Sequence, residues 1–459
     1  MIRLYKKIFA YNRMILGKLK KHLDQIKKGG LIVIIKKFRT CIYFIFQVPV
    51  YLSSIILIII IRSIKPWLLI RWFGLKAGRI GHLVVNTELY SCRQEAKINQ
   101  PSQKCFDIFF LNSKNICNKQ LIKMLERSLI IFPAFLMIPL FYVNRFFNLF
   151  IDAGNQHEID INVDVERDVH GVMDKMNPHI SFNDEEKIKG EKILREFGIP
   201  EHSKFVCLTV RDSAYLDRYK NLTLRDFSYH NYRDCDVDNF LLAAEELANR
   251  GYYVFRMGVK VLKPLKSSNP KVIDYANSKM RSDFMDMYLS ANCTFGISTA
   301  TGLDMVFYVF RKPIAYTSVV PISHMQVQAK NDLHIPKHHF NKKNKKRLTV
   351  SEIFSSNVAF SLASDEYQNN NIELLGNTPE EIKELVIEMD ERISGNWKET
   401  QEDLRLQKQV WNVYENNMQK MYLQNPKDPY FEWRDIKNGL KIKSKFSASF
   451  LRNNQDWIK

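Results

Sequence analysis

The stretch SDFMDMYLSANCTFGISTATGLDMVFYVFRKPIAYTS, residues 282–318, decides the fold class. It opens with helical periodicity, continues with the short apolar run CTFGIS (293–298), and repeats this pattern with GLDMVFYVF (302–310) and KPIAYTS (312–318). Strands that alternate with helices of this length predict a parallel sheet with right-handed crossover connections. Between the two halves lies TFGISTATGLD (294–304), in which a strand ends in small hydroxylated residues and one glycine.

The same alternation extends in both directions along the chain. Upstream, KFVCLTV (204–210) and YYVFRMG (252–258) have strand character, and NFLLAAEELANR (239–250) is a helix between them. Residues 183–198 and 378–393 each begin with the residues of a capping box, which predicts the start of a helix. We therefore expect a Rossmann-like domain in this part of the chain.

The N-terminal half contains weaker signals of the same kind. GRIGHLVVNTELYSC (78–92) resembles a glycine turn that leads into a helix, and CFDIFFL (105–111) resembles a strand. The predicted class is α/β with two Rossmann-like domains and an N-terminal basic and apolar membrane-associating segment. The expected parts are a basic segment, an apolar membrane-associating segment, an N-terminal Rossmann-like domain, a C-terminal Rossmann-like domain and a helical tail that packs back on the domains, at residues 1–40, 41–74, 75–185, 186–395 and 396–459.

The charge of the chain is concentrated at its N-terminus. The formal net charge is +19, and residues 1–40 hold twelve Lys and Arg against one acid, Asp24, which gives 12 − 1 = +11. Because this charge directly precedes an apolar run, it favours an anionic membrane over nucleic acid as the partner. The seven scattered cysteines contain no CxxC pair, so they indicate a reducing compartment and neither a disulfide framework nor a zinc site.

Two apolar segments could contact a membrane. Residues 41–61 are nearly long enough to span a bilayer, but Gln47 and Pro49 interrupt them and basic residues flank both ends, so the sequence does not decide whether they cross. Residues 129–143 contain two prolines and are short for a span. For this second segment an interfacial helix and a buried core helix both remain open.

Hydroxylated and basic residues are expected at the carboxyl edge of the sheet predicted for residues 186–395, where open parallel sheets bind ligands. An anion there would meet unpaired N–H groups and the positive end of a helix dipole. Asp304, in the first helical turn, either binds a ligand hydroxyl or favours the dipole. The residues predicted to bind a phosphate or diphosphate are Arg211, Arg256, Ser298, Thr299, Thr301, Gly302 and Asp304. A helix capped by its own Ser or Thr, and arginines in surface ion pairs, remain open as alternatives.

Several cofactor and metal motifs are absent from the sequence. It contains no GxxxxGK[ST], and GRIGH is not GxGxxG, so no dinucleotide cofactor is expected. RDCDVD (233–238) resembles a metal-binding DxD set, but its place before a helix favours capping. The histidines of residues 334–339 lie in or beside a lysine-rich segment (337–347) that we expect to be a solvated loop, so no metal is predicted.

Several long segments resemble a family of bacterial glycosyltransferases associated with surface-polysaccharide synthesis, such as lipopolysaccharide or capsule. The segments are GRIGHLVVNTELY, FVCLTVRDSAYL, YHNYRDCDVDNFLLAAEELANRGYYVFRMG, DYANSKMRSDFMDMYLSANCTFGISTATGLD and FRKPIAY, with NTPEEI, EMDER, NWKET and FLRNNQDW nearer the C-terminus. They cover most of residues 78–459. The resemblance implies a GT-B architecture and transfer of a sugar from a nucleotide-diphosphate donor. Residues 75–185 would then be the acceptor domain, residues 186–395 the donor-binding domain, and the predicted anion site the donor-binding site.

A metal-independent transfer needs a base for the acceptor hydroxyl, and His82, Glu88 and Asp212 are the candidates. His82 is preferred because it lies in the glycine turn at a strand end. The expected partners are a nucleotide sugar, a glycan or lipid-linked acceptor and a membrane surface, at the cytoplasmic face of the bacterial inner membrane. The alternative from another class is a non-catalytic membrane-associated scaffold that retains a nucleotide-sugar-binding fold.

Overall fold

The computed structural model describes residues 24–25, 31, 33–35, 37–38, 48–113, 115–150, 156–161, 166–217, 226–356, 358–426, 436 and 440–459. The chain divides into two compact units. Unit 1 comprises Met1–Ala77, Asn99–Asn115 and Leu129–Asp160, and unit 2 comprises Gly78–Ile98, Ile116–Ser128 and Ile161–Lys459. Apart from eight scattered residues, the expected basic segment 1–40 lies outside the described residues, as do residues 41–47 of the expected apolar segment.

Unit 1 is built on two parallel strands, β1 (Leu69–Leu75) and β2 (Cys105–Leu111), which pair along their whole length. Single parallel bridges add Glu158 beside β1 and Ile131 beside β2. A helix over residues 48–64 and α4 (Ala134–Phe150) pack on these strands. The helices and strands share a core of Ile58, Trp72, Phe110, Met137 and Val143.

Two domain expectations require correction here. The acceptor domain was expected to begin at residue 75, after an apolar segment 41–74, but residues 69–75 are the first strand of unit 1. The cause is that a buried parallel strand is apolar on both faces, so it reads as a continuation of the apolar run before it. The two following helices, α2 (Ile80–Glu95) and α3 (Lys119–Ser128), belong to unit 2 rather than to an N-terminal domain. Among the described residues, no helix combines the length and apolarity needed to cross a bilayer.

Unit 2 contains a seven-stranded sheet in which every paired strand is parallel, as predicted. Its order is β12-β8-β7-β6-β3-β4-β5. The strands are β3 (Phe205–Thr209), β4 (Tyr253–Arg256), β5 (Val272–Ile273), β6 (Gly296–Ser298), β7 (Ile314–Val319), β8 (Leu333–Pro336) and β12 (Lys445–Phe446). The chain winds outward from β3 to β5, returns to place β6 beside β3, and then winds the other way. The direction of winding therefore reverses between β3 and β6.

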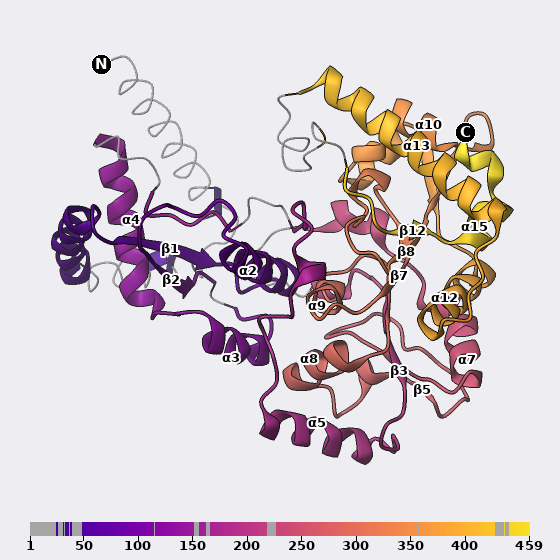
Figure 1. The fold of residues 1–459 in the computed structure, drawn as a ribbon, viewed down its shortest axis with the longest axis horizontal. Coiled ribbons are helices and arrows are strands. Elements are labelled where there is room, and N and C mark those ends of the chain that lie inside the picture. The colour runs from indigo at the N-terminus through magenta and orange to yellow at the C-terminus, as the bar shows by residue number, and fades with distance from the viewer. Residues whose placement is uncertain are drawn as a thin grey trace. The chain divides into compact units, whose positions relative to one another are not determined.

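Helices cover both faces of this sheet (Figure 1). On one side lie α8 (Asp283–Asn292) and α9 (Asp304–Val309), and on the other lie α7 (Leu241–Asn249) and α12 (Pro379–Ser394). The predicted capping boxes are both present, at the start of α5 (Asp184–Glu196) and at the start of α12. These caps satisfy N–H groups that the first turn of a helix leaves without a partner.

The lysine-rich segment 337–347 is a solvated loop only in part: residues 342–345 form an exposed turn, whereas the residues on either side of it are strands, contrary to expectation. It forms β9 (His338–Asn341) and β10 (Lys346–Arg347), which pair antiparallel, and β9 also pairs with β11 (Ile372–Leu375). His339 is fully buried, and burial lowers its pKa to about 4. Lysines on an edge strand are compatible with a sheet, because they discourage pairing with other chains.

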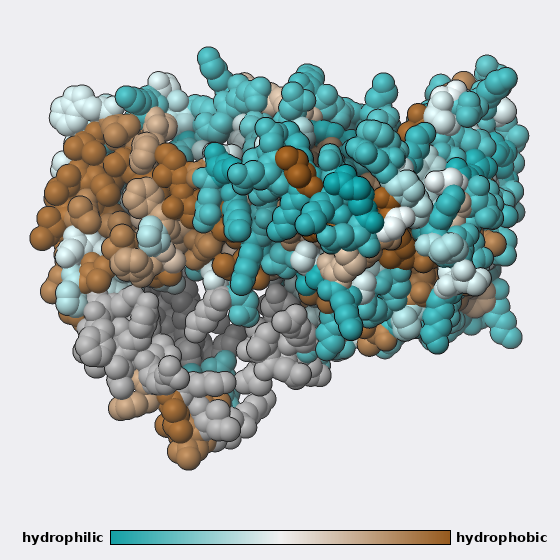
Figure 2. Space-filling view, turned by 90° about the horizontal axis from the view of Figure 1, so that it is seen from below, coloured by the Kyte–Doolittle hydropathy of each residue, from teal (hydrophilic) through white to brown (hydrophobic). Residues whose placement is uncertain are grey.

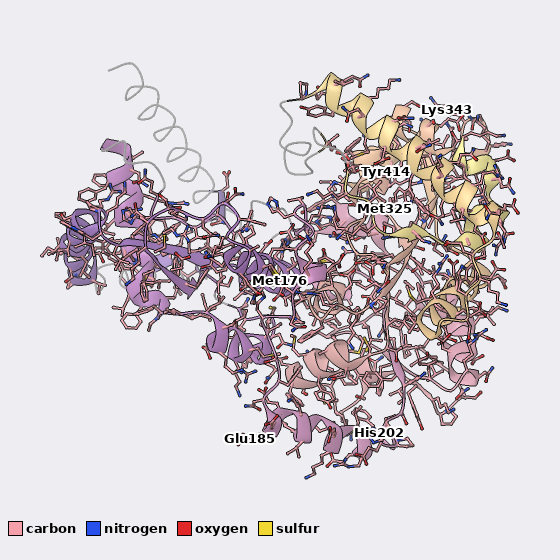
Figure 3. The ribbon with its side chains drawn as sticks, viewed as in Figure 1. Met176, Glu185, His202, Met325, Lys343 and Tyr414 are labelled. Atoms are coloured by element: carbon pink, nitrogen blue, oxygen red, sulfur yellow. The ribbon has the colours of Figure 1, made fainter. Side chains whose placement is uncertain are left out.

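The C-terminal tail is helical, as expected, but it also completes the large sheet. α13 (Gln401–Gln424) packs on α15 (Ala448–Asn453), and β12 between them pairs with β8. Tyr414 of α13, labelled in Figure 3, is fully buried, and its hydroxyl donates to the carbonyl oxygens of Ile322 and Ser323, each at 3.3 Å. The tail is therefore part of the fold of unit 2.

Candidate functional site

A cavity of about 480 Å³ opens at the carboxyl edge of the large sheet, within unit 2. Its walls include residues that follow β3, β4, β6 and β7, among them Arg211, Gly258, Thr301 and Val320. It thus lies where the winding of the sheet reverses, and in doubly wound sheets ligands bind at this point. The segment 294–304 was expected at this edge, and residues 300–304 line the cavity.

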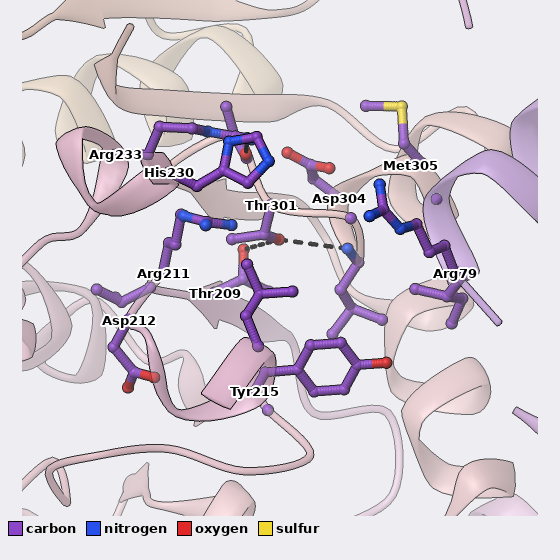
Figure 4. A pocket seen from close by; sticks show the side chains of 18 of the residues that line it. Arg79, Thr209, Arg211, Asp212, Tyr215, His230, Arg233, Thr301, Asp304 and Met305 are labelled. Carbon is purple, nitrogen blue, oxygen red and sulfur yellow. Dashed lines mark hydrogen bonds between the residues drawn. The ribbon is translucent and has the colours of Figure 1, made fainter. Parts of the chain in front are cut away.

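Two arginines lie close together in the cavity wall. Arg211 follows β3, and its Nε is 3.3 Å from Oδ1 of Asp234 but makes no hydrogen bond within the described part of the chain. Burial, and then the charge of Arg233, lower the pKa of Arg211 to about 10. Arg233, which sequence reasoning missed, donates to the carbonyl oxygen of Ala300 (Figure 4). A pair of incompletely neutralised guanidinium groups favours an anionic ligand with several oxygen acceptors.

The N-terminus of α2 forms another part of the wall. This 16-residue helix has Arg79 as its N-cap, without a side-chain cap and without an acid in its first turn. Arg79 is exposed and lies on the side of the cavity away from Arg211 and Arg233 (Figure 4). Because the first amides of a helix lack intrahelical partners and carry partial positive charge, this end attracts an anion. The sequence predicted one helix N-terminus at the site, that of the six-residue α9, and the structure shows that the N-terminus of α2 also lies in the cavity wall.

Ser298 and Thr299 shape the turn after β6 and do not line the cavity. Ser298 is fully buried, and its hydroxyl donates to Asp304 Oδ2 at 2.9 Å. Thr299 Oγ1 accepts from the backbone N–H of Arg211 at 2.8 Å and so fixes the residue after β3. Ser298 and Thr299 were predicted to contact the ligand, but in the structure their hydroxyl groups hold the turn instead. Thr301 does line the cavity, and its Oγ1 is 3.4 Å from Oγ1 of Thr209 (Figure 4).

Asp304 lines the cavity although its side chain is fully buried. Burial raises its pKa to about 7, against which the hydrogen bond from Ser298 and the charge of Arg233 act. A buried carboxyl group that titrates near neutrality in a cavity is a candidate for binding or proton transfer. The sequence leaves Asp304 open between a hydroxyl ligand and a dipole partner; in the fold its Oδ2 accepts from Ser298 at 2.9 Å in the first turn of α9.

His82 forms a dyad with Glu166, a residue that sequence reasoning missed. Both line the cavity, and His82 Nδ1 is 2.7 Å from Glu166 Oε1, which also accepts from Asn86 at 3.1 Å. Burial acts to raise the pKa of Glu166, but the hydrogen bonds from His82 and Asn86 hold it below its usual value. A carboxylate can only accept, so it fixes the proton on Nδ1 and leaves the lone pair on Nε2. Glu166 also has φ of 59°, a strained conformation of the kind that clusters at functional sites.

Glu88, a predicted catalytic residue, does not line the cavity. Its buried carboxylate accepts from Arg311 at 2.6 Å and lies 3.2 Å from His179 Nδ1. Burial acts to raise the pKa of Glu88, but His179 and Arg311 hold it below its usual value. Glu88 is therefore a structural ion-pair partner. Its group with Cys92 and His179 is compact enough for a metal, but the Arg311 guanidinium inside it opposes a cation.

Arg256 and Asp212 also differ from expectation. Arg256 does not line the cavity, since it is 1% exposed and lies between Asp212 at 3.7 Å and Asp274 at 3.8 Å. Asp212 does line the cavity, but its two oxygens accept from the backbone N–H groups of Ala214 and Leu262 at 3.0 and 2.9 Å. These contacts make Asp212 a loop-fixing residue and a poor candidate for the base.

The three aspartates of residues 233–238 have separate protein partners. Asp234 pairs with Arg211, and burial raises the pKa of Asp234 to about 6. Asp236 accepts from the backbone N–H of Asp238 at the start of a short 3-10 helix, and both of these carboxylates bind Lys263. Capping and ion pairing therefore account for this acidic cluster.

Comparison with known proteins gives distant structural similarities. No protein-family model and no curated protein matches the chain. The chain is similar to the glycosyl transferase family 9 structure from Veillonella parvula DSM 2008, with 12% identity, coverage of 55% of this chain and 80% of that chain, and a TM-score of 0.31. It is also similar to ADP-heptose lps heptosyltransferase II from E. coli, with 12% identity, coverage of 55% and 86%, and a TM-score of 0.30. At these values neither similarity bears on function, and the function is inferred below from the residues of the site.

Proposed function

We propose that this protein is a glycosyltransferase that moves a sugar from a nucleotide-diphosphate donor to a glycan or lipid-linked acceptor in bacterial surface-polysaccharide synthesis. The observation that carries the proposal is the position of Arg211 and Arg233 in a cavity at the winding reversal of a parallel sheet. The cavity volume of about 480 Å³ falls within the usual range for sites of small ligands.

The arginines would act on the leaving group. As the bond from the anomeric carbon to the diphosphate breaks, negative charge develops on the diphosphate oxygen. Arg211 and Arg233 present fixed positive charge to that oxygen, and such preorganised charge lowers the barrier. Arg211 is suited to this role because Thr299 and Asp234 hold it in place before the donor binds. No cofactor and no metal is needed for these steps.

The dyad would act on the acceptor. His82 Nε2 takes the proton of the acceptor hydroxyl while its oxygen attacks the anomeric carbon, and Glu166 stabilises the imidazolium that forms. The pair of Glu166 and His82 resembles the arrangement in which a buried carboxylate orients a catalytic histidine. Among the three base candidates, His82 is supported by its place in the cavity and its carboxylate partner.

Titration of the full chain with nucleoside diphosphates tests the donor site. We expect binding to the wild type and at least roughly tenfold weaker binding to Arg211→Gln, because a hydrogen bond to a charged group contributes about 1.5–3 kcal/mol. Arg195→Gln is the matched control, since Arg195 is an exposed arginine on α5 outside the cavity. Unchanged affinity in Arg211→Gln, or no binding by the wild type, would refute the donor site.

A second measurement separates catalysis from a scaffold. Mass spectrometry should detect sugar transfer by the wild type, and His82→Ala should lose transfer while it retains nucleotide binding. A wild type that binds nucleotide diphosphates but transfers no sugar to any lipid-linked glycan acceptor would favour the scaffold. We place the reaction at the cytoplasmic face of the bacterial inner membrane, where nucleotide sugars and lipid-linked acceptors meet.

A further inference from the structure

Unit 1 has an unusually apolar surface. Of the 27 large apolar side chains that are well exposed among the described residues, 19 belong to unit 1 and 8 to unit 2, although unit 2 is the larger. Figure 2 shows this apolar surface gathered over unit 1, while most of the visible surface of unit 2 is hydrophilic. Soluble surfaces rarely leave such large side chains together, so a patch of this kind marks an interaction site.

The helix over residues 48–64 is apolar on both of its faces. Its inner face packs on the core of unit 1 through Ile58, which is fully buried, and through Tyr51 and Ile61. On its outer face, Leu52 is 60% exposed and Ile56 is 64% exposed, and Ile55, Ile59 and Ile60 continue this face. A helix held along one side by protein presents its other side to the surroundings along its whole length.

The neighbouring helix α4 has the same design. Met137 and Val143 are buried in the core, whereas Phe135, Tyr142 and Phe146 are each more than half exposed. The two helices are joined where Arg62 donates to Asn144 Oδ1 at 2.7 Å. We call the outer surfaces of residues 48–64 and α4 together the apolar face.

The positive charge of the N-terminal part of the chain indicates which kind of surface the apolar face binds. Residues 25–87 contain no Asp or Glu, and residues 1–40 carry a net charge of +11. In the described part of unit 1, Asp107 is paired with Arg71 at 2.6 Å and Glu158 with Arg145 at 2.8 Å, and Asp24 and Asp160 are the remaining acids, so little negative charge opposes an anionic surface. Exposed Trp67 and Tyr142 belong to the residue types that settle at the boundary between headgroups and acyl chains.

We propose that the apolar face docks in the plane of an anionic phospholipid bilayer, with residues 48–64 and α4 lying side-on at the headgroup boundary. Interfacial helices of this kind combine buried apolar side chains with attraction to anionic lipid. The inner face of residues 48–64 is already packed on protein, which holds this helix along the surface of unit 1. This proposal is independent of the sugar-transfer chemistry.

Flotation of the full chain with vesicles tests the proposal. The wild type should float with vesicles that contain phosphatidylglycerol and much less with vesicles of phosphatidylcholine alone. The double variant Leu52→Glu/Ile56→Glu should lower the bound fraction at least roughly tenfold, because both side chains would otherwise leave water. The matched control Ile188→Glu/Leu423→Glu changes two similarly exposed residues of unit 2, at 63% and 69%, and should bind as the wild type does.

Three results would overturn the proposal. One is equal flotation of the Leu52→Glu/Ile56→Glu variant and the wild type. Another is resistance of the membrane-bound wild type to extraction by alkaline carbonate, which would indicate a chain that spans the bilayer. The third is a wild type that ignores vesicles but forms dimers that the same variant dissociates, which would assign the apolar face to a second copy. Circular dichroism of the variant should match the wild type, since both substituted side chains are exposed.

Discussion

Gly81→Ala should destabilise the contact between α2 and the turn after β6, which together form part of the cavity wall. A Cβ at Gly81 would lie 2.9 Å from the carbonyl oxygen of Gly302 and 3.1 Å from its Cα, both backbone atoms that cannot rotate away. Ordinary contact begins at 3.4 Å, so α2 or the turn after β6 must move by about 3.4 − 2.9 = 0.5 Å. Overpacking of this kind costs about 1–3 kcal/mol, and the better helix propensity of alanine returns about 0.5–1 kcal/mol.

The expected net loss for Gly81→Ala is therefore up to about 2.5 kcal/mol of unfolding free energy (3 − 0.5), with a middle value of about 1 kcal/mol, which lowers the Tm by roughly 2–4 °C. Gly302→Ala is the matched control, because its Cβ would meet nothing closer than 3.6 Å. Differential scanning calorimetry of the three proteins measures the difference, and titration with a nucleoside diphosphate should show weaker binding to Gly81→Ala. Equal Tm values for the two variants would refute the close approach of α2 to the turn.

Three further predictions follow from the site. Asp304→Asn should remove a pH dependence: the folded-state pKa of about 7 exceeds the usual value of 3.8, so the wild type loses stability as pH rises between these values. Urea unfolding at about pH 5 and pH 8 should show that loss in the wild type and not in the variant; parallel curves would contradict it. Glu88→Gln should lower the unfolding free energy by about 3 kcal/mol, because it leaves the Arg311 charge unbalanced, yet nucleotide titration should be unchanged; lost binding in a folded variant would count against a structural role. EDTA should leave the transfer rate unchanged, and a rate restored only by added Mg²⁺ would show that a metal takes part.

The fold of unit 2 could be predicted because its signals are local. Capping boxes at Asn183 and Thr378 require only residues three apart, and the alternation of strands and helices requires only short windows. The domain organisation of the N-terminal half was harder to infer, because β1 is hidden in an apolar run and α2 belongs to unit 2. The strands β9 and β10 could not be predicted from composition, because the lysines of the turn between them and of the edge strand β10 give the whole segment the polarity of a solvated loop.

The site was only partly predictable because its residues come from distant segments. Strand ends located Arg211 and Thr301, but Glu166 meets His82 from 84 positions away and no local pattern announces it. Arg256 shows the limit of the strand-end argument: its position at the edge was correct, but two nearby aspartates hold its side chain outside the cavity. Long-range pairing of charges is a property of the folded chain that spacing alone does not reveal.

The pairing of β12 with β8 has a consequence for biosynthesis. β12 begins roughly 110 positions after β8 ends, so at about 5–20 residues per second the ribosome completes it some 5–20 seconds later. During that interval the nascent sheet has an open edge at β8, which can pair with the strands of other chains. Synonymous codons that slow translation across residues 340–445 should therefore increase aggregation of newly made protein without altering the mature fold.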